Sequence, residues 1–285
     1  MIVSGSSSQS LAASLAAALS EPLADVSVSH FPDGELLAAI EDGLASVERA
    51  VIVAATVSSD DHLELLQLQD AAREAGVGEV VTVLPYMGYA RQDRAFEAGQ
   101  PVSARAVARA VSTGTDRVLT VNPHERAVCD FFDPPATAVD AAPALAEPLP
   151  ADLDDPVFLS PDAGAVDIAE AVRDAHGGGT VDYFEKTRRS GTEVEIAPSD
   201  VAVADRDVVV VDDIIATGGT MSEAVAVLES RGAARTFVGC VHPLLAGAAY
   251  TRLSRAGVEA IYGTDTIEGP ASAVSVAPIL ADALE

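Results

Sequence analysis

The sequence contains no tryptophan, only two cysteines and a single lysine, Lys186, beside 16 arginines. Cys129 and Cys240 lie far apart and lack the short spacing of metal-binding cysteines, so we expect two small buried thiols and no disulfide framework. No apolar run reaches the roughly 18 residues of a membrane-spanning helix, and Met1–Gly5 lacks the basic start of a signal peptide. We therefore expect a cytoplasmic protein.

Basic charge is scarce as well: 17 basic residues face 44 acidic ones, which gives a net charge of −27. Such a field repels nucleic-acid backbones and anionic lipid, so we expect no nucleic-acid partner and no membrane partner. An anionic ligand then needs a local cluster of cations, backbone N–H groups or a metal. A strongly acidic, lysine-poor surface favours solubility in very high salt, which screens self-repulsion. We interpret the protein as halophilic; an ordinary acidic mesophilic protein is the alternative.

The 285 residues are 49% hydrophobic, enough for one large domain or two of average size. Short β-branched runs alternate with alanine- and leucine-rich stretches, which predicts an α/β fold. We expect two tandem domains, each a mostly parallel sheet flanked by helices, over residues 1–140 and 141–285. A proline-rich crossover is predicted over residues 133–155, and a last helix, Val276–Leu284, could pack on either domain.

The individual elements follow from the same patterns. The predicted strands are Val51–Ala55, Val80–Leu84, Arg117–Val121, Val157–Ser160, Val208–Val211 and Phe237–Val241. The predicted helices are Asp60–Ala75, Pro101–Val111, Gly164–His176 and Met221–Arg231.

The most informative segment is the strand Val208–Val211 with the acids and glycines that follow it. Glycines let the backbone curl around a group, and the N-terminus of the next helix points N–H donors at it, which favours a phosphate monoester. The adjacent carboxylates suit sugar hydroxyls or a metal bound to them. The segment predicts a ribose-5-phosphate site, with an ordinary strand–turn–helix as the alternative. Its residues are Asp212, Asp213, Ala216, Thr217, Gly218, Gly219 and Thr220.

The acid pair and the Thr-Gly-Gly-Thr loop resemble the phosphoribosyl-diphosphate motif of the type I phosphoribosyltransferase fold. Five further blocks narrow the resemblance to the ribose-phosphate pyrophosphokinases, which make phosphoribosyl diphosphate from ATP and ribose 5-phosphate. These blocks are Phe31–Glu35, Pro85–Arg94, Asn122–Glu125, Ser160–Gly164 and Lys186–Arg189. They span nearly the whole chain, and their order is more specific than any one of them.

The resemblance implies an ATP site in the first domain. In the family, the positions of Arg91 and Gln92 bind ATP, and the fork of a guanidinium fits a polyphosphate. Arg94 and Asp93 lie beside them, so a surface ion-pair cluster is the alternative for this block.

A second ATP-binding block contains an aromatic residue, Phe31, and a turn of two acids around a glycine. Phe31 offers a face for a purine, and the carboxylates accept hydrogen bonds from its amine. The turn residues are Asp33, Gly34 and Glu35. In the family this block usually contacts the adenine of an ATP molecule that is bound by a neighbouring subunit. The resemblance therefore implies a homo-oligomer, at least a dimer. An ordinary β-turn is the alternative.

Metal binding is also implied by the resemblance. His124 and Asp162 follow predicted strands, where ligands collect in open α/β sheets. In the family both positions contribute to Mg²⁺ binding, although hard cations prefer oxygen ligands to histidine. Bacterial relatives typically carry aspartate where this chain has Asn122, so the chain has one carboxylate fewer near the metal.

The single lysine lies in a basic stretch, Lys186–Arg189, of an otherwise acidic chain. A compact ammonium differs from a planar guanidinium where a point charge must follow a moving phosphoryl oxygen. The resemblance implies that Lys186 and Arg188 are catalytic, closing over the site and stabilising the transferring group, with Arg188 also near ribose 5-phosphate. A solvated hairpin tip is the alternative.

The resemblance implies transfer of the β,γ-diphosphoryl group of ATP to the anomeric hydroxyl of ribose 5-phosphate, which leaves AMP. Two other functions remain open. A phosphoribosyltransferase would use the same loop, but many relatives carry aspartate at the position of Ala216, where it can act as a base. A non-catalytic regulatory homologue would lack some of the catalytic groups named above.

Overall fold

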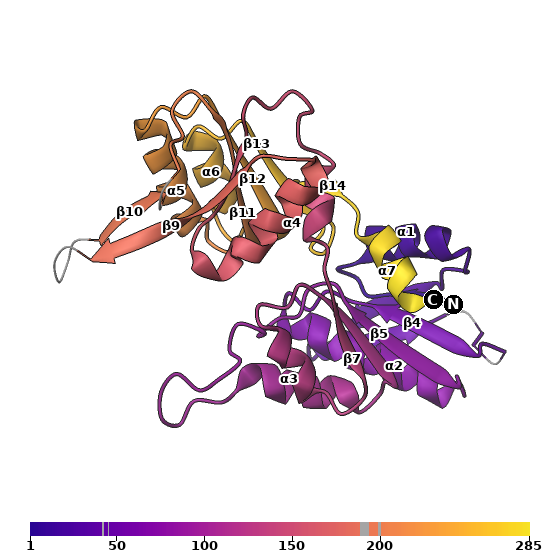
Figure 1. Ribbon diagram of the computed structural model, residues 1–285. Helices are drawn as coiled ribbons and strands as arrows, with labels where there is room; N and C mark the ends of the chain where they lie inside the picture. Colours follow the sequence, from indigo (N-terminus) through magenta and orange to yellow (C-terminus); the bar gives the residue numbers. More distant parts are fainter. Residues whose placement is uncertain (42, 45, 189–193, 199–200) are drawn as a thin grey trace. The chain divides into compact units, whose positions relative to one another are not determined.

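The computed structural model spans residues 1–285. It describes all of them except residues 42, 45, 189–193 and 199–200, and it also leaves out the side chains of residues 186–188 and 194–198. Contacts divide the chain into two compact units. The first contains Met1–Asp140, Asp265–Glu268 and Ser275–Glu285, and the second contains Ala141–Thr264 and Gly269–Val274. Figure 1 shows a sheet with flanking helices in each unit.

The first unit is built on a five-stranded sheet in the order β1-β4-β5-β6-β7, in which every neighbouring pair is parallel. Its strands carry runs of valine, isoleucine and alanine, the pattern of strands buried on both faces. Their carboxyl ends all meet at one edge, which is where loops gather functional residues. The strands are β1 (Ile2–Ser4), β4 (Arg49–Val53), β5 (Glu79–Leu84), β6 (Arg117–Val121) and β7 (Ala136–Val139).

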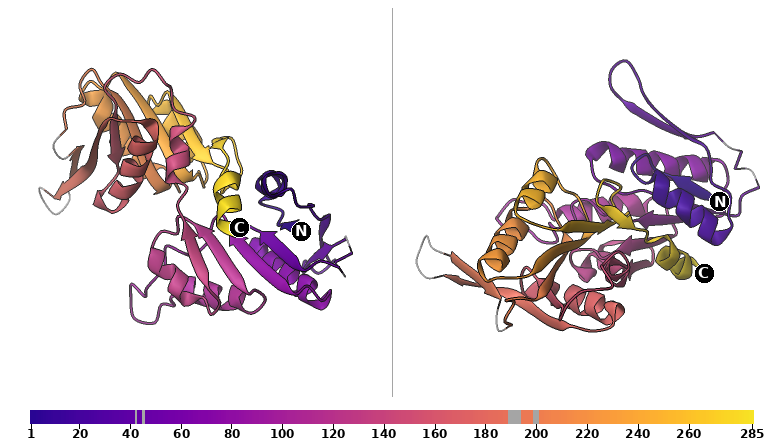
Figure 2. Two further views of the ribbon diagram at one scale, coloured as in Figure 1. Left: turned by 45° about the vertical axis from the view of Figure 1, so that its right-hand side comes forward. Right: turned by 90° about the horizontal axis from the view of Figure 1, so that it is seen from above.

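Helices and a hairpin surround this sheet. The antiparallel hairpin of β2 and β3 packs against α2, whose Gln67 side chain bonds the backbone of Leu36 and Ala38 at 2.8 and 2.7 Å. The C-terminal helix α7 packs beside α1 (Figure 2). The elements are α1 (Gln9–Leu19), β2 (Val26–His30), β3 (Leu36–Ile40), α2 (Ser59–Glu74), α3 (Ser103–Ser112), η1 (Arg126–Phe131) and α7 (Ala277–Leu284).

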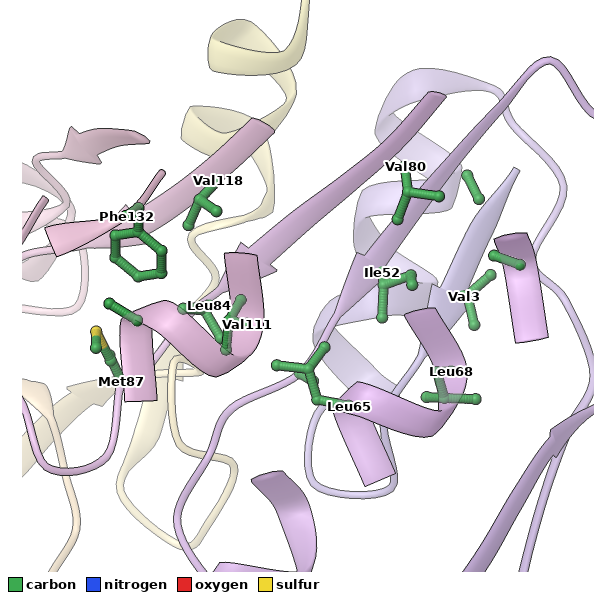
Figure 3. Packing of buried hydrophobic residues seen from close by; sticks show 14 of the residues in the cluster. Val3, Ile52, Leu65, Leu68, Val80, Leu84, Met87, Val111, Val118 and Phe132 are labelled. Atoms are coloured by element: carbon green, nitrogen blue, oxygen red, sulfur yellow. The ribbon is translucent and has the colours of Figure 1, made fainter. Parts of the chain in front are cut away.

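The core of the first unit lies between the sheet and helices α2 and α3. Ile52 and Val80 of neighbouring strands are fully buried with Leu65 and Leu68 of α2 (Figure 3). Each such side chain contributes about 1.5–3 kcal/mol by burial. This packed core therefore fixes the carboxyl ends of the strands, from which the loops with the predicted ATP-binding residues start.

The second unit is a seven-stranded sheet in the order β10-β9-β8-β11-β12-β13-β14. All neighbouring pairs are parallel except β9 and β10, which form an antiparallel hairpin. The strands are β8 (Val157–Ser160), β9 (Thr180–Arg188), β10 (Val194–Pro198), β11 (Asp207–Ile214), β12 (Arg235–His242), β13 (Ala260–Thr264) and β14 (Ser272–Val274). The helices are η2 (Ala142–Ala146), η3 (Ala163–Ala165), α4 (Val166–His176), α5 (Gly219–Ser230) and α6 (Ala249–Arg255).

The predicted α/β fold with two parallel sheets is confirmed, and each predicted strand and helix is present with boundaries shifted by a few residues. Two details differ. The expected crossover over 133–155 begins with β7, because Ala136–Val139 completes the edge of the first sheet. The helix expected from Gly164 starts at Val166 after the short turn η3, which Asp162 caps.

The last helix packs in the first unit, beside α1. Cys129 and Cys240 are free thiols, the first half-buried and the second buried. Within the described residues, none of the helices combines the length and the apolar character that crossing a bilayer requires.

An ion pair between a buried carboxylate and a half-buried arginine anchors the start of β11. Arg235 of β12 donates to Asp207 at 2.9 and 2.5 Å, and Asp207 is only 2% exposed. The bonds from Arg235 and the Asp154 N–H hold the pKa of Asp207 below its usual range, although burial opposes this shift. The strand that carries the acid pair therefore depends on this contact.

We expect Arg235→Met to lower the Tm by about 5 °C or more at neutral pH, because it leaves the buried carboxylate of Asp207 without a cationic partner. A carboxyl whose pKa is lowered by folding stabilises the fold when the pH is above the pKa of that carboxyl in the unfolded chain. This contribution disappears as the pH falls through the lower pKa of the folded protein. The Tm difference between the two proteins should therefore shrink in acid. A difference that stays constant with pH in calorimetric scans would contradict this explanation.

Candidate active site

The acid pair lies at the carboxyl end of β11, in the middle of the second sheet. Burial, the charge of Asp213 and a hydrogen bond between the two side chains raise the pKa of Asp212 to about 8. Its Oδ1 accepts the N–H of Asp213 at 2.9 Å. Two carboxylates this close and partly buried favour a hydroxyl-rich ligand or a cation, since either relieves their repulsion.

The loop after the acid pair turns into the N-terminus of α5. Gly218, the residue before the helix, has φ +72°, and a Cβ there would lie 3.3 Å from the Cβ of Ala249. Glycine adopts this backbone conformation without strain. Ser222 on the first turn of α5 donates to the Gly218 carbonyl at 2.7 Å. The loop therefore presents N–H groups at a helix N-terminus, the arrangement that binds phosphate.

Neighbouring strands bring two more groups to the acid pair. Asp162 follows β8, which lies beside β11, and its negative charge contributes to the raised pKa of Asp212. Its own carboxylate accepts the Gly164 N–H at 3.0 Å. On the other side, Cys240 of β12 is fully buried, and its Sγ accepts the Ile215 N–H at 3.1 Å. Burial raises the pKa of this thiol, so it remains protonated.

Strand β9 carries Lys186 and Arg188. It pairs in parallel with β8, and Ser160, the last residue of β8, is opposite Tyr183. The remainder of β9 continues past that end, toward the side on which Asp162 lies, and pairs there with β10. The side chains of Lys186 and Arg188 lie outside the described residues, as does Arg189, so their roles stay predictions.

In the first unit, Arg91 and Gln92 follow β5. The Gln92 carboxamide oxygen accepts the Ser103 hydroxyl at 2.5 Å, and its backbone carbonyl accepts the Ala104 N–H at 3.2 Å. Gln92 is therefore fixed at the start of α3. Arg91 is exposed, and no carboxylate in the described part of the chain pairs with it.

The next strand, β6, leads to His124, which is exposed. Asn122 has φ +32° and donates from its side chain to Asp140 at 2.7 Å. Since β5 and β6 are parallel neighbours, their loops leave the same edge of the sheet. The structure thus brings the loops of Arg91 and His124 to one edge.

The turn Phe31–Glu35 joins β2 and β3 and lies at the tip of their hairpin (Figure 2). Gly34 has φ +94° and donates to the Phe31 carbonyl at 2.8 Å, while Phe31 is 50% exposed. In the described part of the chain, no hydrogen bond or ion pair joins this turn to Arg91 or Gln92. The structure thus leaves the predicted adenine-binding turn open to solvent.

Cys240 and Arg252 also lie beside the site, and the sequence alone does not predict either as a neighbour of it. Arg252 of α6 donates to the Thr217 carbonyl in the loop at 2.9 Å. Sequence spacing gives no signal for this contact, because 35 residues separate the partners. The apolar strand around Cys240 does predict a buried thiol there, but not its position beside Ile215.

The donor set near Asp212 fits Mg²⁺. The described residues contain no cluster of three or more histidine, cysteine or acidic side chains arranged to hold a metal. Mg²⁺ needs no such cluster, because it usually binds one or two carboxylates and completes its shell with water and substrate phosphates. Asp162 and the acid pair supply such carboxylates.

We expect Gly218→Ala to weaken ribose 5-phosphate binding about tenfold or more and to destabilise the fold by about 1–2 kcal/mol. The added Cβ is strained at φ +72° and presses on Ala249. Gly257→Ala is the matched control, since Gly257 has φ +88° and open space around its Cβ position. Equal loss of binding in both variants, measured by calorimetric titration, would show that backbone strain alone is responsible.

A parallel sheet that ends in an acid pair, followed by a glycine loop at a helix N-terminus, defines a domain of the phosphoribosyltransferase type. Residues 140–275 match the phosphoribosyl transferase domain family, and residues 1–114 match the N-terminal domain of ribose phosphate pyrophosphokinase. The chain belongs to the ribose-phosphate pyrophosphokinase family and is an enzyme with the activity of that family.

Individual relatives agree along the full chain. A ribose-phosphate pyrophosphokinase of Halobacterium salinarum is 66% identical over 284 residues, covering 100% of both chains. One from Methanosarcina mazei is 43% identical over 284 residues, covering 99% of this chain and 94% of the relative. The structure is similar to that of phosphoribosylpyrophosphate synthetase from Mycobacterium smegmatis, with a TM-score of 0.86 and 28% identity, covering 100% and 97% of the two chains.

Proposed function

We propose that the chain transfers the β,γ-diphosphoryl group of ATP to the anomeric hydroxyl of ribose 5-phosphate, giving 5-phosphoribosyl 1-diphosphate and AMP for nucleotide biosynthesis. The observation that carries the proposal is the acid pair of β11 next to the glycine loop at the start of α5. The loop Ala216–Thr220 binds the 5-phosphate. Asp212 and Asp213 accept hydrogen bonds from the ribose hydroxyls.

ATP binds to residues 1–140 in this proposal, and ribose 5-phosphate to the second domain. The exposed guanidinium of Arg91 binds the polyphosphate of ATP. The hydrogen bond from Ser103 orients Gln92 for its own contact with ATP. His124 lies at the same sheet edge. The adenine stacks on Phe31 and bonds the turn Asp33–Glu35 of a neighbouring subunit, so the enzyme is at least a dimer. An exposed turn with no described link to Arg91 of its own chain is what such sharing requires.

The anomeric oxygen bonds to the β-phosphorus and loses its proton to water, while the bond from the β-phosphorus to the oxygen that bridges the α- and β-phosphates breaks, and that oxygen leaves with AMP. The protein holds the two substrates in line and neutralises charge on the moving group. Lys186 and Arg188 supply positive charge at the transferring group, because β9 extends past the strand end that precedes Asp162. His124, near the ATP phosphates, and Asp162, near the reacting group, would each contribute to Mg²⁺ binding, and the bound metal would supply further charge neutralisation. We place the enzyme in the cytoplasm, where reduced thiols persist.

The test is product analysis in molar KCl with Mg²⁺, ATP and ribose 5-phosphate, separating AMP from ADP by ion-exchange chromatography. We expect AMP, formed only when ribose 5-phosphate is present. A second reaction supplies phosphoribosyl diphosphate with each nucleobase. Diphosphate release in that reaction, without AMP in the first, would identify a phosphoribosyltransferase and overturn the proposal.

A further inference from the structure

A second segment of the chain runs along the phosphate loop. It comprises residues 242–252, from the last residue of β12 to the first turn of α6. The Leu245 N–H donates to the Ile215 carbonyl at 2.9 Å, and the Ala246 N–H donates to the Ala216 carbonyl at 2.8 Å. Two successive carbonyls of the loop are therefore turned toward this segment.

The third carbonyl is held by a side chain. Nη1 of Arg252 donates to the Thr217 carbonyl at 2.9 Å. The same nitrogen lies 4.0 Å from the position of a Cβ on Gly219. Any residue could supply the two backbone bonds, but this third bond needs a long cationic or amide side chain at position 252.

These three bonds fix the direction of the N–H groups in the loop. In a trans peptide, the carbonyl and the N–H of the next residue point in opposite directions. The N–H groups of Ala216, Thr217 and Gly218 therefore point away from residues 242–252. No acceptor among the described residues bonds any of the three. Successive N–H groups that point one way and lack a protein partner form a site for an anion.

We propose that Arg252 is a positioning residue for the 5-phosphate of ribose 5-phosphate, because its bond to the Thr217 carbonyl aims the Gly218 N–H at the phosphate. This inference rests on the proposed function. Arg252 is exposed, and no carboxylate of the described chain pairs with it, in a protein of net charge −27. Its charge is thus uncompensated beside the loop and favours an anion there.

The test compares Arg252→Met with Arg255→Met in molar KCl. Arg255 lies on the same helix, is exposed and has no described contact with the loop, so both variants lose one positive charge. Calorimetric titration with ribose 5-phosphate, without ATP, measures the site alone. We expect about tenfold weaker binding for Arg252→Met and unchanged binding for Arg255→Met. Arg252→Lys should fall between, because an ammonium can still donate to the Thr217 carbonyl.

Steady-state kinetics separates positioning from a structural role. A positioning role predicts that Arg252→Met raises the KM for ribose 5-phosphate about tenfold, with kcat and the KM for ATP within about twofold of the unchanged protein. Equal ribose 5-phosphate affinity in Arg252→Met and the unchanged protein would overturn the inference. So would parallel losses in Tm, ATP binding and sugar binding. If the unchanged protein itself binds no ribose 5-phosphate, the proposed function falls first.

Discussion

Lys186→Ala is expected to lower kcat about 100-fold or more, with only a modest change in the KM for ATP. In the proposed mechanism, Lys186 stabilises the diphosphoryl group during transfer and contributes little to the binding of ATP beforehand. The chain uses arginine at its other 16 Lys/Arg positions, and the proposal assigns the compact ammonium of this one lysine to the transferring group. Lys186→Arg should also lower kcat, by less than the alanine variant, because a planar guanidinium keeps the charge but not its compact shape.

The single lysine also permits a chemical test. An amine-reactive acetylating reagent modifies one side chain in this protein, Lys186, besides the α-amino group. Acetylation should abolish most of the activity of the unchanged protein, and Mg–ATP with ribose 5-phosphate should protect it. The residual activity of Lys186→Ala should be unaffected by the reagent. A Lys186→Ala variant with near-normal kcat would remove Lys186 from the mechanism.

Asp212→Asn is expected to lower kcat/KM for ribose 5-phosphate about 100-fold or more, while making the free protein more stable above neutral pH. Activity is expected to fall because the variant loses the proposed acceptor for the ribose hydroxyls. Stability rises because the pKa of Asp212 is about 8 in the folded protein, well above that of an ordinary carboxyl. Functional sites often carry such a stability cost.

The sign of the pH effect follows from linkage. Between the ordinary carboxyl pKa and about 8, the unfolded chain has lost the proton of Asp212 while the folded protein keeps it, so the free energy of unfolding falls as the pH rises. The asparagine variant has no carboxyl at position 212, so its free energy of unfolding does not fall for this reason. Its Tm advantage should therefore grow from acid to about pH 8 and then level off. Asp167→Asn, at an exposed position of α4, is the control and should show no such trend. An advantage independent of pH would contradict the shared burial of the acid pair.

The sequence predicts much of the second domain because its signals are local. An apolar strand, two acids and a glycine loop are contiguous in the chain, and the alternation of strands and helices predicts parallel sheets. By contrast, the sequence predicts a linker where β7 lies, since Ala136–Val139 is short and lies among prolines. The contact of Arg252 with Thr217 joins segments 35 residues apart and appears only once the sheet order is known.

The first domain is harder to predict. Its loops bring Arg91 and His124 to one sheet edge because β5 and β6 are neighbours, which their order in the chain suggests. The turn Phe31–Glu35 has the pattern of an ordinary β-turn, and the adenine contact proposed for it depends on a partner that a single chain cannot supply. Functional groups shared between subunits leave no periodicity in one sequence.

Phosphorus NMR of the reaction in molar KCl tests the central claim most directly. The claim is that both terminal phosphates of ATP move together to the anomeric oxygen of ribose 5-phosphate. It predicts that AMP and a new sugar diphosphate, with two coupled signals beside the 5-phosphate, grow at equal rates as ATP disappears. ADP with a sugar bisphosphate would contradict it, because attack would then fall on the γ-phosphorus.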